Sequence, residues 1–320
     1  MIRAGIMIEG QEGLTWQRWR RIAETAEALG FESLWRSDHL FSLYDVPTRP
    51  GLDTWSSLTA LAMMTRRLRF GPLVCPITFR HPAVLAREAA AVDALSGGRL
   101  ELGLGAGWHD REHQAFGIPY PRVGERIRRL DEGIRVIRAL WSDGAAHFEG
   151  QFYRLDGAVG WPKPVQTPRI PLIVGGKGPR LLDIVAKHAD EWNCGGSRPP
   201  ADVRTRSEML DAACRAIGRD PREIRRSWMG AFLIGENASI LERRARKIQE
   251  YVPPRAATPA SHLPAVLRNE GWLVGSPAEI VGQMRALAAE GIERFMLQFY
   301  DQEDLEALHL LAEQVVPRVA

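Results

Sequence analysis

The chain has 320 residues, of which 45% are hydrophobic and 25% are charged, and its formal net charge is +3. Such a small and dispersed charge argues against nucleic-acid binding, and no apolar run reaches the roughly 18 residues that a membrane span requires. The three cysteines are too few and too widely spaced for a disulfide framework, and the amino terminus lacks the apolar stretch of a signal peptide. We therefore expect a globular cytoplasmic enzyme with a small-molecule substrate, which binds neither nucleic acid nor membrane.

Strand and helix patterns alternate through the first 141 residues. Apolar runs and helical spacing predict strands at 3–8, 33–36, 68–75 and 99–104, and helices at 16–29, 55–64, 82–95 and 122–141. The first helix is followed by Gly30, the residue type that most often ends a helix. This alternation is typical of parallel strands joined by right-handed crossovers.

The second half resumes the alternation after an interruption at 142–169, where we expect a hairpin at 147–155 and a rigid coil at 161–164. Further strands are predicted at 170–174, 191–193, 225–234 and 294–299, and further helices at 179–189, 200–217, 238–251, from Ser276 onward and at 304–316. The stretch 252–269 holds four prolines and little periodicity, so we expect no packed element there but a mobile lid or partial disorder.

Eight predicted strands, each followed by a helix, favour a closed (β/α)8 barrel of the TIM type over two open sheets. No change in composition marks a domain boundary. We therefore expect one domain over residues 1–320, with insertions at the carboxyl face of the barrel.

Unusual residues collect where the predicted strands end, which is where such barrels carry their chemistry. Asp38 and His39 follow the second strand, and Cys75 ends the third. After the fourth strand come Gly105, Ala106, Gly107, Trp108 and His109. A G-x-G-x-x-G dinucleotide motif fails here, because Trp108 stands where its third glycine belongs.

His109, Glu112 and His113 match the H-x-x-E-H pattern of some zinc proteases. That motif needs a stable helix with both histidines on one face and a distant third ligand. Gly107 and Gly117 flank the segment closely, so a long helix is not expected. We predict no metal, and interpret the segment as a short polar turn over the mouth of a pocket.

The turn after the fifth strand, made of Gly175, Gly176, Lys177, Gly178 and Pro179, predicts a phosphate site. Glycines expose backbone N–H groups at the start of a helix, where an anion is favoured. Lys177 adds a full positive charge. The alternative is a tight strand-to-helix turn without a ligand.

His39 is a candidate general acid or a contact for a cofactor ring, although it could also cap loop carbonyls. Asp38 would orient His39 or cap the following loop. Aromatic residues near the predicted strand ends could sandwich a planar ring, although core packing explains most aromatics. They are Trp35, Phe41, Trp108, Phe116, Trp192 and Phe299.

Taken together, these motifs resemble the bacterial-luciferase-like flavin and deazaflavin oxidoreductases over essentially the whole chain. The resemblance is carried by Trp35-Arg36-Ser37-Asp38-His39-Leu40-Phe41, Thr78-Phe79-Arg80-His81-Pro82, Gly103-x-Gly105-Ala106-Gly107-Trp108, Glu112-His113-x-Ala115-Phe116-Gly117, Gly175-Gly176-Lys177-Gly178 and Ala189-Asp190-Glu191-Trp192-Asn193. The Ser-Asp-His and Gly-Ala-Gly-Trp segments are most similar to the branch that uses coenzyme F420.

The resemblance implies that the cofactor ring lies in the barrel mouth against the third strand, beside Leu73, Val74 and Cys75. Members of the family have a non-proline cis peptide there, which would join Leu73 and Val74. His39 would contact the ring, with Asp38 and residues 105–107 nearby, and residues 175–179 would hold the phosphate. Many deazaflavin members carry an acidic residue where this chain has Trp108, so an acid at that position is absent and an apolar substrate floor is suggested. His39, Trp108 and His109 are the candidate catalytic residues.

Three functions remain open at this point. The first is a deazaflavin (coenzyme F420)-dependent oxidoreductase that transfers a hydride to or from a small organic substrate. The alternative is an FMN-dependent monooxygenase that receives reduced flavin from a separate reductase. The third is a flavin-binding relative without enzymatic activity. A homodimer is expected in each case.

Overall fold

The computed structural model describes residues 2–319, and its centre is a parallel barrel. Eight strands run around it, because β3 and β4 together form the strand predicted at 68–75. In chain order they are β1 (Arg3–Ile8), β2 (Ser33–Arg36), β3 (Arg69–Pro72) with β4 (Cys75–Pro76), β5 (Leu102–Gly105), β8 (Leu172–Gly175), β9 (Glu191–Asn193), β10 (Arg225–Ile234) and β12 (Arg294–Gln298). Hydrogen-bonded neighbours follow the order β3-β2-β1-β12-β10-β9-β8-β5-β4, and a bridge between Phe70 and Leu100 joins the two ends. The predicted (β/α)8 barrel is confirmed.

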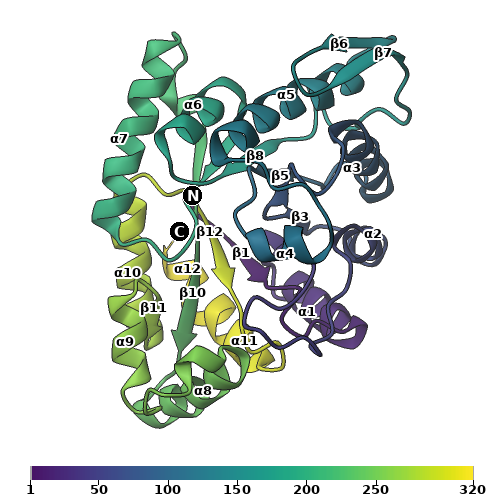
Figure 1. Cartoon of the computed structure of the whole chain (residues 1–320). Helices are drawn as coiled ribbons and strands as arrows, with labels where there is room; N and C mark the ends of the chain where they lie inside the picture. The colour runs from purple at the N-terminus through teal and green to yellow at the C-terminus, as the bar shows by residue number, and fades with distance from the viewer. Residues whose placement is uncertain (1, 320) are drawn as a thin grey trace.

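Helices form a ring around the strands (Figure 1). In order around the barrel they are α1 (Trp16–Ala28), α2 (Thr54–Met64), α3 (Pro82–Ser96), α5 (Val123–Trp141), α6 (Pro179–His188), α7 (Pro200–Ala216), α10 (Pro277–Ala289) and α11 (Leu305–Gln314), followed by the short α12 (Val316–Val319). Each contacts the next, and α11 returns to α1. The ring therefore closes with the barrel.

Two apolar layers hold the barrel together. Ile6 and Ile8 of β1 belong to the large core between strands and helices, whereas Met7 belongs to a separate cluster. Successive side chains of a strand point to opposite faces, so this second cluster fills the barrel interior. Its buried members are Met7, Trp35, Leu73, Ile173 and Met296.

The helix boundaries have local causes. The side chain of Asp53 accepts a hydrogen bond at the start of α2, and Ser276 and Glu279 form a reciprocal capping box at the start of α10. Gly97 ends α3 in the left-handed region, with φ of 66°. These signals explain why most predicted helices lie within a few residues of the observed ones.

Insertions lie between barrel elements. The hairpin predicted at 147–155 is the antiparallel pair β6 (Ala146–Glu149) and β7 (Arg154–Ala158). The short helix α4 (Asp110–Ala115) follows β5. A larger insertion follows β10 and consists of α8 (Ala238–Tyr251), the 3-10 turn η2 (Pro253–Arg255), α9 (Leu263–Asn269) and β11 (Leu273–Gly275), which pairs with β10. A further 3-10 turn, η1 (Pro221–Glu223), precedes β10.

The expectation that 252–269 forms no packed element is wrong. Its residues include η2 and α9, and Leu263 and Leu267 are fully buried beside Val252. Prolines stand in the first turn of both elements, where a missing N–H group breaks no helical hydrogen bond. The prolines of this segment therefore indicate where short helices begin and are not a sign of disorder.

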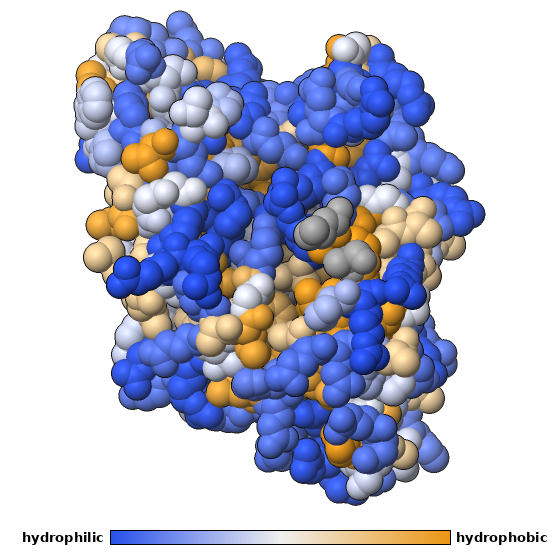
Figure 2. Space-filling view, turned by 180° about the vertical axis from the view of Figure 1, so that it is seen from behind, coloured by the Kyte–Doolittle hydropathy of each residue, from blue (hydrophilic) through white to orange (hydrophobic). Residues whose placement is uncertain are grey.

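One face of the molecule is mostly polar. On the face opposite the view of Figure 1, hydrophilic side chains cover most of the area and apolar ones show in patches between them (Figure 2). Within residues 2–319, no helix has both the length and the apolar character needed to cross a membrane.

Candidate active site

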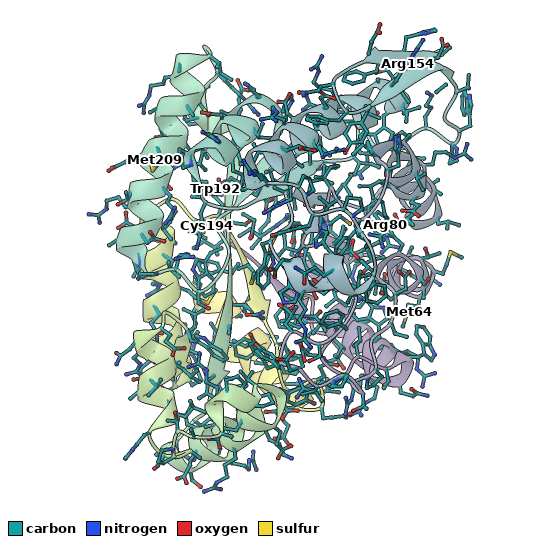
Figure 3. All side chains as sticks on the ribbon, viewed as in Figure 1. Met64, Arg80, Arg154, Trp192, Cys194 and Met209 are labelled. Carbon is teal, nitrogen blue, oxygen red and sulfur yellow. The ribbon has the colours of Figure 1, made fainter. Side chains whose placement is uncertain are left out.

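A cavity of about 980 Å³ opens where the barrel strands end. Residues that directly follow seven different strands line it, among them Glu9 after β1, His39 after β2, Trp108 after β5, Cys194 after β9 and Tyr300 after β12. Predicted site residues that line the cavity are His39, Leu73, Val74, Gly105, Ala106, Gly107, Trp108, Gly175, Gly176, Lys177 and Gly178. Asp38, Cys75, His109 and Pro179 are not among the lining residues. Figure 3 labels Arg80 and Cys194 on opposite sides of the barrel.

The third strand is interrupted at the cavity, and the peptide bond between Leu73 and Val74 is cis, as the family resemblance implied. The Val74 side chain fills the space beside neighbouring glycines. A Cβ on Gly105 would lie 2.7 Å from Val74 Cγ2, and one on Gly175 would lie 3.1 Å from Val74 Cγ1. These glycines therefore make room for Val74, which in turn faces the cavity. Gly107 has a different reason, since its φ of 78° lies in the left-handed region.

His39 is held by Glu112 rather than by Asp38. The Nδ1 atom of His39 lies 2.7 Å from Glu112 Oε2, and the backbone N–H of Leu40 donates to Glu112 Oε1 at 2.5 Å. Asp38 instead accepts from Arg80, with 2.5 Å between Oδ2 and Nη1. The prediction that Asp38 orients His39 is thus wrong, because the paired arginine occupies its carboxylate.

The His39–Glu112 pair favours its charged state. Burial opposes charge on His39, but the hydrogen bond and the charge of Glu112 outweigh it and raise the pKa of His39 above its usual value. Burial likewise opposes charge on Glu112, yet His39 lowers the pKa of that carboxyl. With Nδ1 facing Glu112, the other ring nitrogen of His39, Nε2, is the one available to a ligand in the cavity.

Two of the H-x-x-E-H residues, Glu112 and His113, are hydrogen-bonded to protein atoms, whereas His109 Nδ1 has no hydrogen-bond partner within residues 2–319. His113 uses Nδ1 toward the carbonyl oxygen of His109 and Nε2 toward Thr78 Oγ1, both at 2.7 Å. His109 Nδ1 lies 3.2 Å from the Glu112 carboxylate. Over residues 2–319, no group of three or more His, Cys, Asp or Glu side chains is arranged to hold a metal ion. The segment is the short helix α4, which is longer than the expected turn but still less than two full turns.

Trp108 covers the His39 side of the cavity. Its side chain is 66% exposed and meets His39 edge-on, with 5.7 Å between ring centroids. It also meets His109 at 5.1 Å. The indole supplies an apolar surface and no carboxyl group, so Trp108 cannot act as a carboxylic acid at this position.

The turn after the fifth barrel strand, residues 175–179, combines a helix N-terminus that lacks a side-chain cap with positive charge. Gly178 is the N-cap of α6 and offers no side chain to the free N–H groups. Gly176 has φ of 139°, and a Cβ there would lie 1.9 Å from Leu181. Burial first, and then the charges of Arg198 and Arg206, lower the pKa of Lys177. Three cations therefore surround this helix end, a favourable setting for an anion.

One carboxylate, that of Asp202, partly neutralises this positive cluster. Asp202 lies 3.1 Å from Arg206 Nε and 3.5 Å from Arg198 Nε. Arg206 also donates from Nη1 to the carbonyl oxygen of Lys177 at 2.7 Å. Lys177 itself forms no ion pair within the described residues 2–319, so its charge remains available to a ligand.

Sequence reasoning missed several lining residues. Glu9 directly follows β1, Cys194 follows β9 and Tyr300 follows β12, so the strand-end rule would have found them. Arg198 and Trp272 come from later in their loops and gave no such signal. The role of Glu112 also escaped, because its contact with His39 spans 73 residues.

Comparison with known proteins decides the family, since the model described as luciferase-like monooxygenase matches residues 2–294. The chain belongs to the luciferase-like monooxygenase family. This luciferase-like chain is 29% identical over 310 residues to an F420-dependent glucose-6-phosphate dehydrogenase of Kineococcus radiotolerans, covering 92% of the chain and 90% of the relative. It is 25% identical over 311 residues to an FMNH(2)-dependent dimethylsulfone monooxygenase of Pseudomonas putida, covering 90% and 84%. An F420-dependent secondary alcohol dehydrogenase, solved in complex with an F420-acetone adduct, shares the fold with a TM-score of 0.84 at 20% identity, covering 100% of this chain and 99% of that one.

Proposed function

We propose that this luciferase-like protein is an oxidoreductase that uses coenzyme F420 to transfer a hydride to or from a small organic substrate. The observation that carries the proposal is the cavity at the strand ends, which has a cationic helix start at one side and a charged His39–Glu112 pair at another. If the ring of the cofactor lies between these two groups, the phosphate of the cofactor would lie near the start of α6. The likeness to an F420-dependent dehydrogenase over nine-tenths of both chains supports the choice of cofactor.

The residues present fit such a cofactor. The uncapped α6 start, with Lys177 and Arg198, would hold a phosphate, and Val74 would back a planar ring. When bound, the deazaflavin supplies the two-electron chemistry by taking up or giving a hydride. His39 would hold or move the substrate proton at Nε2, while Glu112 keeps the ring in place and charged. Trp108 would exclude water from that side.

A second candidate is an FMN-dependent monooxygenase that receives reduced flavin from a separate reductase. The likeness to the dimethylsulfone monooxygenase favours it, and the same phosphate turn and ring position would serve FMN. The two cofactors differ in reaction with oxygen, so the choice is experimental.

The test is a titration of the purified apo protein with coenzyme F420 and with FMN, followed by fluorescence quenching. We expect tighter binding of F420 and a Lys177→Ala variant that binds it about 10- to 150-fold more weakly, since a charge-assisted contact contributes about 1.5–3 kcal/mol. The difference should shrink at high salt. Lys187→Ala is the matched control, because Lys187 is exposed in the last turn of the same helix.

Tighter binding of FMN, with oxygen consumed when reduced FMN is supplied, would select the second candidate. Binding of neither cofactor would reject both. F420 binding that Lys177→Ala leaves unchanged would move the phosphate site to another turn.

We also propose that residues 1–320 act as one domain, and that the protein is a homodimer in the cytoplasm. Cys75, Cys194 and Cys214 are buried free thiols, a usage that suits a reducing compartment. The exposed apolar residues Met63 of α2 and Val84 and Leu95 of α3 support the dimer.

A further inference from the structure

The cavity has two ends of different chemistry. Near α6 it is lined by the cations Lys177, Arg198 and Arg126. Another part of the lining is formed by Tyr44, Val252, Trp272 and Tyr300, which we call the aromatic end, and its Trp272 lies close to the segment that carries Arg198. A phosphate-bearing cofactor suits the first, which leaves the aromatic end for a second molecule.

The aromatic end is a built wall. The rings of Trp272 and Tyr300 stack with 5.2 Å between centroids and an interplanar angle of 8°. The hydroxyl oxygens of Tyr44 and Tyr300 lie 3.4 Å apart. Trp272 and Val252 also belong to the buried cluster of the α8–α9 insertion, against which both tyrosines pack. The wall is therefore positioned by a packed core before any ligand arrives.

Charged groups around this end are already paired. Arg255 and Glu270 line the cavity and form a two-point ion pair, with 2.5 Å between Nη1 and Oε1. Glu12 accepts from the Leu43 N–H at 2.8 Å and also binds Arg49. Glu9 accepts from Gln11 at 2.8 Å. The cations of the described lining near this end are Arg255 and, beside Trp272, Arg198, whose Nε lies 3.5 Å from Asp202. Both are paired with carboxylates, which would repel an anion.

The two phenols keep their protons. Burial raises the pKa of Tyr300 well above its usual value, and burial also raises the pKa of Tyr44. Both hydroxyls therefore remain donors at neutral pH. Since each can donate to the other or to a ligand, a single acceptor oxygen placed between them would satisfy the pair.

We propose that the aromatic end binds a flat, uncharged and largely apolar substrate whose one oxygen accepts from the Tyr44 and Tyr300 hydroxyls. The inference rests on the proposed function for the statement that the molecule bound there is the substrate. It separates this chain from the sugar-phosphate dehydrogenase to which it is similar, because the cations near the aromatic end, Arg255 and Arg198, are each paired with a carboxylate within residues 2–319.

The experiment measures binding by calorimetry to the F420-loaded protein, with 2-naphthol, naphthalene and glucose 6-phosphate as probes. We expect 2-naphthol to bind and glucose 6-phosphate to show no binding at the same concentrations. The double variant Tyr44→Phe, Tyr300→Phe should weaken 2-naphthol about tenfold, which is about 1.4 kcal/mol, and leave naphthalene unchanged. Tyr251→Phe is the matched control, since Tyr251 packs on the same cluster but does not line the cavity.

A melting curve of each variant verifies that the fold is retained, and phenylalanine preserves the rings. Binding of glucose 6-phosphate as tight as that of 2-naphthol would overturn the inference, as would equal losses for 2-naphthol and naphthalene in the double variant. The same titrations on cofactor-free protein separate the two proposals. If F420 fails to bind but 2-naphthol binding still depends on the two hydroxyls, the proposed function is wrong and the aromatic site stands. If F420 binds and 2-naphthol does not, the substrate class is wrong.

Discussion

The charge on His39 depends on a residue from another part of the chain. Glu112 lies in α4 and is fully buried, yet both of its oxygens are engaged, one by His39 and one by the Leu40 N–H. A buried carboxylate is stable as an anion only when it is paired in this way. Glu112 therefore fixes the orientation and the charge of the His39 ring, and acts as a positioning residue.

Replacing Glu112 with Gln should lower the pKa of His39. The carboxylate raises that pKa, whereas burial lowers it, so its removal leaves burial as the dominant effect. The measurement is an NMR titration of the His39 ring protons in wild type and in Glu112→Gln, together with the pH profile of turnover, whose basic limb should move to lower pH because the protonated ring is then lost earlier. Asp110→Asn is the control, because Asp110 is exposed on the same helix. An unchanged His39 titration would show that Glu112 is only structural.

At the scale of single residues, the sequence predicted which residues line the cavity better than it predicted which side chains form hydrogen bonds with one another. His39, Trp108 and Lys177 were found because they follow barrel strands, and all three line the cavity. The pairing of His39 with Glu112, and of Asp38 with Arg80, requires knowing which loops meet above the barrel. Hydrophobic periodicity carries no information about such contacts between loops.

At the scale of elements, the barrel strands and the main helices followed from periodicity, whereas α9 did not. Leu263 and Leu267 are four residues apart on one face of that helix, but the segment is too short for a periodic signal. Its stability comes from packing against β11 and α8, which lie outside the segment. Local patterns fail where a tertiary contact supplies the stabilisation.

The outer surfaces of α2 and α3 predict a dimer interface. Both helices carry exposed apolar residues beside polar ones such as Ser56 and Arg87, and Met63, Val84 and Leu95 are each at least half exposed. Because the two helices are neighbours in the ring, these residues can form one apolar surface. We expect sedimentation equilibrium to give the mass of two chains, and Met63→Asp to raise the dimer dissociation constant at least about tenfold, since a charge would be buried unpaired.

The control for this experiment is Ile217→Asp, which places the same charge at an exposed apolar residue after α7. Its dissociation constant should match that of the wild type. A wild-type mass of one chain would reject the dimer. If Met63→Asp and Ile217→Asp have the same dimer dissociation constant, the interface does not lie on α2 and α3.

The two ends of the barrel differ in structure and in role. At the carboxyl ends of the strands the barrel is open and lined by the candidate site. At the amino ends it is closed by charges, because Arg294 of β12 is fully buried and lies 2.6 Å from Glu101 and 2.9 Å from Glu191. Arg294 also binds Glu32, and Glu101 binds Arg69. This network joins residues at the starts of several strands, so it locks the end of the barrel opposite the cavity.

Glu101→Gln should therefore destabilise the fold without touching the site. Burial opposes charge on Glu101, but Arg294 and Arg69 outweigh it and lower its pKa from 4.5 to about 2. A carboxyl group whose pKa is lower in the folded state stabilises it above the unfolded pKa, and this stabilisation is lost as pH falls toward the folded pKa. Urea unfolding at pH 7 should show a loss of roughly 3–5 kcal/mol for the variant, the usual cost of removing one partner of a buried ion pair.

The pH dependence of that loss identifies its cause. As the pH falls from 4.5 toward 2, wild-type Glu101 becomes protonated as well, so the difference between the two proteins should shrink toward zero. Glu293→Gln is the control, because Glu293 is exposed beside Arg294, and it should change little at any pH. A loss that stays constant down to pH 3 would mean that Glu101 acts through packing rather than charge. Binding of F420 by the folded variant should equal that of the wild type, since the network and the cavity lie at opposite ends of the same strands.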